Sequence, residues 1–158
     1  MTAFTIYGTP FAKQRPRSGF NKRLGRAVTF NTAANVAFED TVASVAAQVF
    51  LDPIEGPVSV TVEAVFCPAA SWSKKRRAAA IGQPHTQKPD GDNVLKAIKD
   101  GLNRIAWADD AQVADSRVVK RWGERAETRV TVNPIPSFGG SATKYGAAPK
   151  RDPKDMCK

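Results

Sequence analysis

Alternation of apolar and polar positions predicts four β-strands. Their segments are AFTIY at 3–7, VSVTVEAVF at 58–66, VADSRVVKRW at 113–122 and ETRVTV at 127–132. Each is rich in the β-branched and aromatic residues that strands favour. The short GER connection after the third segment predicts that the last two strands form a hairpin. Gly8, Pro10 and Pro16 interrupt the pattern after the first strand, so we expect a loop from there to about Phe30.

A spacing of three and four residues between apolar positions predicts helices in two further segments. The first set is Phe38, Val42, Val45 and Val49, and the second is Val94, Leu95, Ile98, Leu102 and Ile105. We therefore expect a helix over about 32–50 with Asn31 as its N-cap, and a helix over 92 to about 104 that begins near Asp92. A short helix is expected where Ser71 or Ser73 precedes a basic block.

Length and composition indicate one small domain followed by a tail. A chain of 158 residues, 42% of them hydrophobic, can bury one core of ordinary size. After Pro134 the composition changes to small, Pro and basic residues, so we expect a folded domain at 1–136 and a basic, disordered tail at 137–158.

The same composition argues against secretion, membrane insertion and a zinc site. The N-terminus lacks the apolar stretch of a signal peptide, and nowhere do about 18 apolar residues run together. Cys67 and Cys157 lie far apart and have no metal-binding spacing. We expect a cytoplasmic protein with reduced thiols and no membrane partner.

Positive charge is concentrated in two segments. The 24 Lys and Arg residues against 15 Asp and Glu give a net charge of +9, which favours a polyanionic partner, although a basic surface kept for solubility is the alternative. The candidate DNA-binding residues are Lys13, Arg15, Arg17, Lys22, Arg23 and Arg26, interleaved with Phe11, Phe20 and Phe30, and the block Lys74, Lys75, Arg76 and Arg77. Such segments suit phosphates with exposed bases beside them, and a solvated loop or helix face is the alternative for each.

Acidic residues gather in one stretch of this basic chain, KPDGDNVLKAIKDGLNRIAWADD at 88–110. Asp90 and Asp92 precede a predicted helix, Lys96 lies one turn along it, and Asp109 and Asp110 follow it at the start of a strand. We expect an adjacent strand to bring one of the last two back beside the helix N-terminus. Three clustered carboxylates repel one another unless they share a cation, and all-oxygen ligation suits Mg²⁺ or Mn²⁺.

Other uses of these acids are possible. An N-cap at Asp92 and its pairing with Lys96 would need no chemistry, but they do not account for Asp90, Asp109 and Asp110 together. A calcium EF-hand loop counted from Asp90 would need Gly and Glu where the chain has Leu95 and Gly101. A sugar-nucleotide DxD site uses similar metal chemistry, but the basic segment from Lys13 to Arg26 and the small size of the chain fit such a protein poorly. A metal-dependent phosphodiester site is the favoured interpretation.

The acidic stretch also resembles the signature of a known family. KPDGDNVLKAIKDGLN followed by WADDAQV is similar to the D-x-D-N-x-x-K-x-x-x-D-x-L and D-D-x-Q-V motifs of RusA-family Holliday junction resolvases. AKQRPR near the N-terminus resembles the basic segment of that family. The match extends over roughly 84–132.

This resemblance implies a Mg²⁺-dependent endodeoxyribonuclease, with Mn²⁺ as a possible substitute, that acts as a homodimer on four-way DNA junctions. It implies a small α+β domain with a mixed β-sheet packed against helices. It assigns Asp90, Asp92 and Asp110 as catalytic metal ligands and Lys96 as the active-site lysine. Asp109, Gln112 and His85 are further candidates. A DNA-binding protein without turnover and a flap or fork nuclease are the alternatives.

Overall fold

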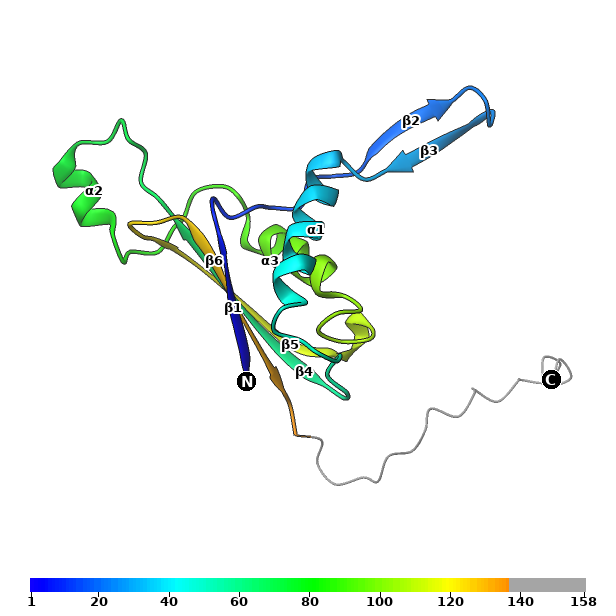
Figure 1. Ribbon diagram of the computed structural model, residues 1–158. Coiled ribbons are helices and arrows are strands. Elements are labelled where there is room, and N and C mark those ends of the chain that lie inside the picture. Colours follow the sequence, from blue (N-terminus) through cyan, green and yellow to red (C-terminus); the bar gives the residue numbers. More distant parts are fainter. Residues whose placement is uncertain (137–158) are drawn as a thin grey trace, which may run out of the picture.

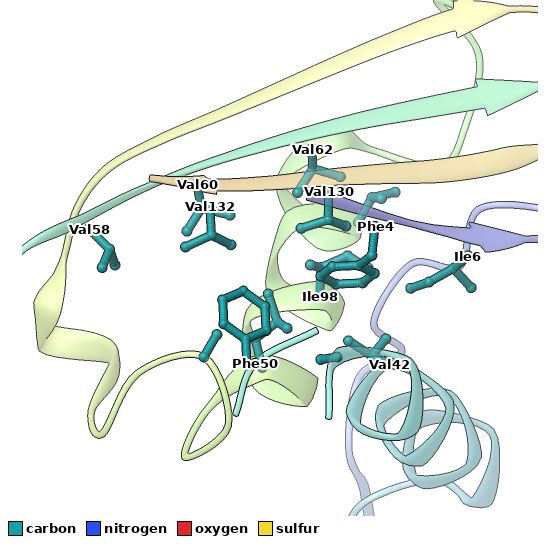
Figure 2. Packing of buried hydrophobic residues seen from close by; sticks show 14 of the residues in the cluster. Phe4, Ile6, Val42, Phe50, Val58, Val60, Val62, Ile98, Val130 and Val132 are labelled. Atoms are coloured by element: carbon teal, nitrogen blue, oxygen red, sulfur yellow. The ribbon is translucent and has the colours of Figure 1, made fainter. Parts of the chain in front are cut away.

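The computed structural model describes residues 1–136, and the tail expected at 137–158 lies outside the described residues. Four strands, β1 (Thr2–Tyr7), β4 (Val58–Phe66), β5 (Val113–Trp122) and β6 (Glu127–Pro134), form a mixed sheet in the order β1-β6-β4-β5. Helices α1 (Ala33–Ala46) and α3 (Gly91–Leu102) pack against one face of it (Figures 1 and 2). The expected α+β class with a mixed sheet is confirmed.

The sheet is organised around β4. Its side chains alternate between buried and partly buried positions and end in three consecutive buried residues, as expected of a strand with neighbours on both sides. It pairs in parallel with β5 and antiparallel with β6. The expected hairpin between the last two strands is therefore wrong, because β4 lies between β5 and β6. The short connection between β5 and β6 suggested that they are neighbours, but β4, whose apolar positions are all buried, takes the central place.

The core lies between the sheet and the two helices, as Figure 2 shows. Val60, Val62 and Val130 of the sheet face Ile98 of α3 and Val42 of α1, and all five are at most 1% exposed. On the opposite face Thr61 pairs with Thr131 and Glu63 with Arg129 across β4 and β6. This division of apolar and polar faces sets the register of the sheet.

Close approach of the two helices depends on a glycine. A Cβ atom added at Gly101 would lie 2.7 Å from Cβ of Val42, so no larger residue fits there without a shift. Helix α1 begins one residue later than expected, since the side chain of Thr32, not Asn31, accepts a hydrogen bond from the Asn35 amide. The close approach at Gly101 thus packs α1 and α3 together in one layer.

Two elements extend from this body. The segment expected as a loop contains a hairpin, β2 (Arg17–Asn21) paired with β3 (Arg26–Phe30), which projects away from the sheet in Figure 1. Helix α2 (Lys74–Ala80) is N-capped by Ser73, as one of the two expected caps. Within residues 1–136, no helix has the length and apolar character needed to cross a membrane.

Candidate active site

The N-terminus of α3 presents two carboxylates. Asp90 is the N-cap residue and Asp92 lies in the first turn, so the helix begins earlier than the expected start near Asp92. Both side chains are exposed, and within the described residues neither has a hydrogen-bond or ion-pair partner. Negative charge at a helix N-terminus is favoured by the helix dipole. Both acids therefore remain available to an external cation.

Gly91 allows this helix end to lie directly on β5. A Cβ atom added there would lie 3.1 Å from Cγ1 of Val118, with the Lys120 side chain also within contact distance. The small residue between the two acids therefore gives a tightly packed turn against the strand.

Lys120 of β5 holds the loop that leads into α3. Its Nζ donates hydrogen bonds to the carbonyl oxygens of Gln87 and Pro89, each at 2.6 Å. Pro89 follows a cis peptide bond and immediately precedes Asp90. An ammonium group thus fixes the backbone one residue before the first acid.

Asp109 and Asp110 lie at the other end of α3, in the 3₁₀ turn η1 (Asp110–Gln112). Asp109 accepts from the Ala111 amide as the cap of this turn. Asp110 Oδ1 accepts from the Trp107 indole at 2.9 Å. Gln112 donates to the carbonyls of residues 54 and 56 and accepts from the amides of residues 108 and 109. Asp109 and Gln112 therefore stabilise this turn, and Asp110 is bonded to Trp107 through one of its two carboxylate oxygens.

A single chain does not bring the three candidate ligands together. Helix α3 has 12 residues, which at 1.5 Å per residue is about 18 Å, and Asp110 follows its far end. Within residues 1–136 no group of three His, Cys, Asp or Glu side chains could hold a metal ion. The expectation that an adjacent strand returns Asp109 or Asp110 to the helix N-terminus is wrong within one chain, because the part of β5 that lies there carries Lys120. The catalytic roles of Asp90, Asp92 and Asp110 stay predictions.

His85 is buried beside this loop. Its ring stacks on Phe66 with centroids 4.0 Å apart and lies 4.2 Å from the Trp122 ring. Burial, reinforced by the positive charge of Lys120, lowers the pKa of His85 below its usual value of 6.5. A neutral, 6% exposed imidazole packs the loop against the sheet and is not placed to touch DNA.

The same aromatic cluster attaches helix α2. Trp72 lies 5.2 Å from Trp122, and the guanidinium of Arg76 lies 3.8 Å above the Trp72 ring. A cation over an aromatic face is attracted by the ring's electrons. The start of the basic helix is thereby attached to Trp122 of β5.

The candidate DNA-binding residues differ in their surroundings. Most have exposed side chains, namely Arg15, Lys22, Arg23, Arg26, Lys74, Lys75, Arg76 and Arg77. Lys13 is different, because its Nζ forms ion pairs with Asp100 and Glu39. Burial alone would lower the pKa of Lys13, but these two carboxylates raise it overall. Lys13 therefore links the segment after β1 to α1 and α3. Arg17 is the first residue of β2.

Sequence comparison identifies the family of the chain. The family model described as endodeoxyribonuclease RusA matches residues 7–133. The chain belongs to the RusA endodeoxyribonuclease family. It is also similar to the uncharacterized protein YqaN of Bacillus subtilis (strain 168), with 37% identity over 139 residues, which are 84% of this chain and 95% of that protein.

Within this candidate site, the sequence did not single out Lys120. The signal was present, since Val118, Lys120 and Trp122 occupy alternate positions of β5 and therefore share one face. A lysine between two apolar residues on the helix-covered face needs acceptors. Those acceptors are carbonyls more than thirty positions away, and no local pattern reveals them.

Replacing Lys120 tests its hold on the acidic loop. We expect Lys120→Met to lower the free energy of unfolding by about 1–3 kcal/mol, because two hydrogen bonds to a charged group are lost. It should also raise the Mg²⁺ concentration needed for DNA cleavage, since Asp90 loses its fixed backbone. Urea unfolding and a metal titration measure the two effects. Lys75→Met on the exposed face of α2 is the control for the unfolding measurement, and an equal loss of stability in both variants would contradict the role of Lys120.

Burial of His85 predicts a specific pH dependence of stability. Because its pKa is lowered in the folded protein, the unfolded chain binds more protons at this residue. Its contribution to stability is therefore present above its usual pKa and lost as the pH falls. We expect the melting temperature of the wild type to drop more than that of His85→Phe from about pH 7.5 to about pH 5. Parallel curves for the two proteins would show that His85 is protonated equally in both states.

Proposed function

We propose that this RusA-family protein is a Mg²⁺-dependent endodeoxyribonuclease that resolves four-way DNA junctions by paired, symmetric nicks. The observation that supports it most is the pair of carboxylates, Asp90 and Asp92, which have no partner within residues 1–136. They lie on a helix N-terminus whose preceding loop is held by Lys120. A basic helix and a basic hairpin belong to the same molecule, and both suit a phosphate backbone.

The donor set suits Mg²⁺. Carboxylate oxygens are its preferred protein ligands, and it is commonly held by one or two of them together with phosphate oxygens and water. Asp90 and Asp92 would hold it, and Asp110, which one chain keeps beyond the far end of α3, would join them as a third ligand from the second chain of the homodimer. Bound there, the ion would activate water for attack and offset negative charge on the scissile phosphate.

The remaining residues of the site orient and neutralise the substrate. Lys96 is exposed and lies one helical turn after Asp92, so its ammonium can contact a phosphate oxygen whose charge grows during the reaction. Exposed basic side chains of α2 and of the β2–β3 hairpin would hold the DNA arms through phosphates, reading shape more than sequence. A homodimer supplies the two sites that symmetric nicking requires.

Removal of one candidate ligand tests the enzyme hypothesis. We expect Asp92→Asn to reduce nicking of a synthetic four-way junction by about 100-fold or more, since even outer-shell partners of metal ligands contribute 10–100-fold. Junction binding should persist or strengthen, because a negative charge near phosphate is removed. Gel assays of binding and cleavage measure both, and Asp40→Asn on the exposed side of α1 is the matched control. Normal cleavage by Asp92→Asn would place the site elsewhere.

The same assay separates the rival functions. Junction binding by the wild-type protein without nicking, at several pH values and with Mg²⁺ or Mn²⁺, would support a DNA-binding protein without turnover. Faster cleavage of flaps or forks than of junctions would support the second alternative. Equal cleavage of linear duplex would contradict structure-specific resolution.

The projecting hairpin predicts a salt-dependent effect on affinity. Lys22 and Arg26 are both exposed, at opposite ends of its turn. The double variant Lys22→Gln and Arg26→Gln should weaken junction binding and reduce the slope of log K against log salt by about 1.8, or 0.9 for each phosphate contact. Cleavage at saturating DNA should be unchanged. Arg125→Gln, between β5 and β6, is the control, and an unchanged slope in the double variant would remove the hairpin from the DNA interface.

A further inference from the structure

Asn35 is a polar side chain that is buried at the base of the β2–β3 hairpin. It lies in the first turn of α1 and is 1% exposed. Its Oδ1 accepts a hydrogen bond from the Gln14 amide, and its Nδ2 donates to the Gln14 carbonyl and to Asn31 Oδ1, each at 2.9 Å. Both N–H groups of the side chain are therefore used. The two bonds to Gln14 are the pair that a residue of a neighbouring antiparallel strand would form.

These bonds join the two connections of the hairpin. Gln14 lies on the segment that enters β2, and Asn31 lies on the segment that leaves β3, whose terminal residues Arg17 and Phe30 are paired. The hairpin is a sheet of its own, separate from the four-stranded sheet, and it meets the rest of the molecule beside the start of α1 (Figure 1). The direction in which the hairpin projects therefore depends on its two connections, and Asn35 bonds to both.

The segment that enters the hairpin is also joined to the acidic end of α3. The Lys13 amide donates to the Asn93 carbonyl at 3.0 Å, and Asn93 directly follows Asp92. The Lys13 ammonium forms ion pairs with Glu39 of α1 and Asp100 of α3. One short segment thus links the base of the hairpin to the helical turn that carries Asp92.

Capping of α1 does not explain the side chain of Asn35. The cap is supplied by Thr32, whose hydroxyl accepts from the backbone amide of Asn35. The side-chain bonds of Asn35 go instead to Gln14 and Asn31, which lie outside the helix. Burying an amide is costly unless its hydrogen bonds are made. The three bonds therefore fix the position of the hairpin connections relative to α1.

We propose that Asn35 is a positioning residue for the DNA substrate. By fixing the direction of the basic hairpin relative to the N-terminus of α3, it directs the DNA that the hairpin holds so that a phosphodiester reaches Asp90 and Asp92. A hairpin without these bonds keeps its charges and still attracts DNA, but it holds the DNA in directions that bring no phosphate to the acids. The loss is therefore in the nicking of bound DNA, not in affinity. This consequence rests on the proposed nuclease function, while the direction of the hairpin can be measured without activity.

Nicking of fully bound DNA tests this positioning. With protein in excess over a synthetic four-way junction, we expect Asn35→Ala to lower the nicking rate by about 10-fold or more, because small displacements of a reacting group are costly. The slope of log K against log salt should stay that of the wild type, since no charge is removed. Thr32→Ala is the matched control, because it removes a bond at the same helix end and leaves the three side-chain bonds of Asn35 intact. A wild-type rate in Asn35→Ala, or equal losses in the two variants, would overturn the proposal.

Residual dipolar couplings measure the direction of the hairpin independently of nicking. In the wild type and in Thr32→Ala, the hairpin amides and those of the four-stranded sheet should fit one alignment tensor. In Asn35→Ala the hairpin should fit only a separate tensor of smaller magnitude, as expected of an element that changes direction. Asn31→Ala, at an exposed position, removes only the bond to the segment that leaves β3. It should show the same change to a smaller degree, and it is the test variant if Asn35→Ala does not fold.

Two results separate this proposal from the proposed function. One common tensor in Asn35→Ala, or in Asn31→Ala where the first variant does not fold, would overturn the role of Asn35. A wild-type protein whose hairpin direction depends on Asn35 but which nicks no junction would instead contradict the nuclease function.

Discussion

The parallel pairing of β4 with β5 determines where the candidate chemistry lies. Parallel neighbours need a crossover connection, and here that connection contains α2 and α3. Helix α3 returns along the sheet with its first residue against the middle of β5, at Val118. The acids before the helix and those after it are consequently separated by the full length of α3. Asp92 and Asp110 are only 18 positions apart in the chain, but they therefore lie at opposite ends of α3.

The charged residues form two groups in this molecule, which differ in their burial. Lys13 forms ion pairs with Asp100 and Glu39 between the segment after β1 and the two helices, so these charges stabilise the layer that supports the site. Asp90 and Asp92 have no such partner among the described residues and are exposed. A basic protein can keep unpartnered acids at this position because the helix N-terminus favours them. The excess of positive charge is directed outward, on the hairpin and α2.

Local sequence patterns were sufficient to predict the elements whose formation depends on neighbouring residues in the chain. The apolar alternation of β4 and the helical period of α3 predicted both elements to within a few residues, since each reflects burial of one face. The sequence failed where partners are distant. The neighbour of β6 depends on the burial of β4 between two strands. The burial of His85 depends on the rings of Phe66 and Trp122, and the hydrogen bonds of Lys120 depend on carbonyl groups of the loop before α3. The acidic cluster was misplaced for the same reason, because its geometry is set by the path of the crossover.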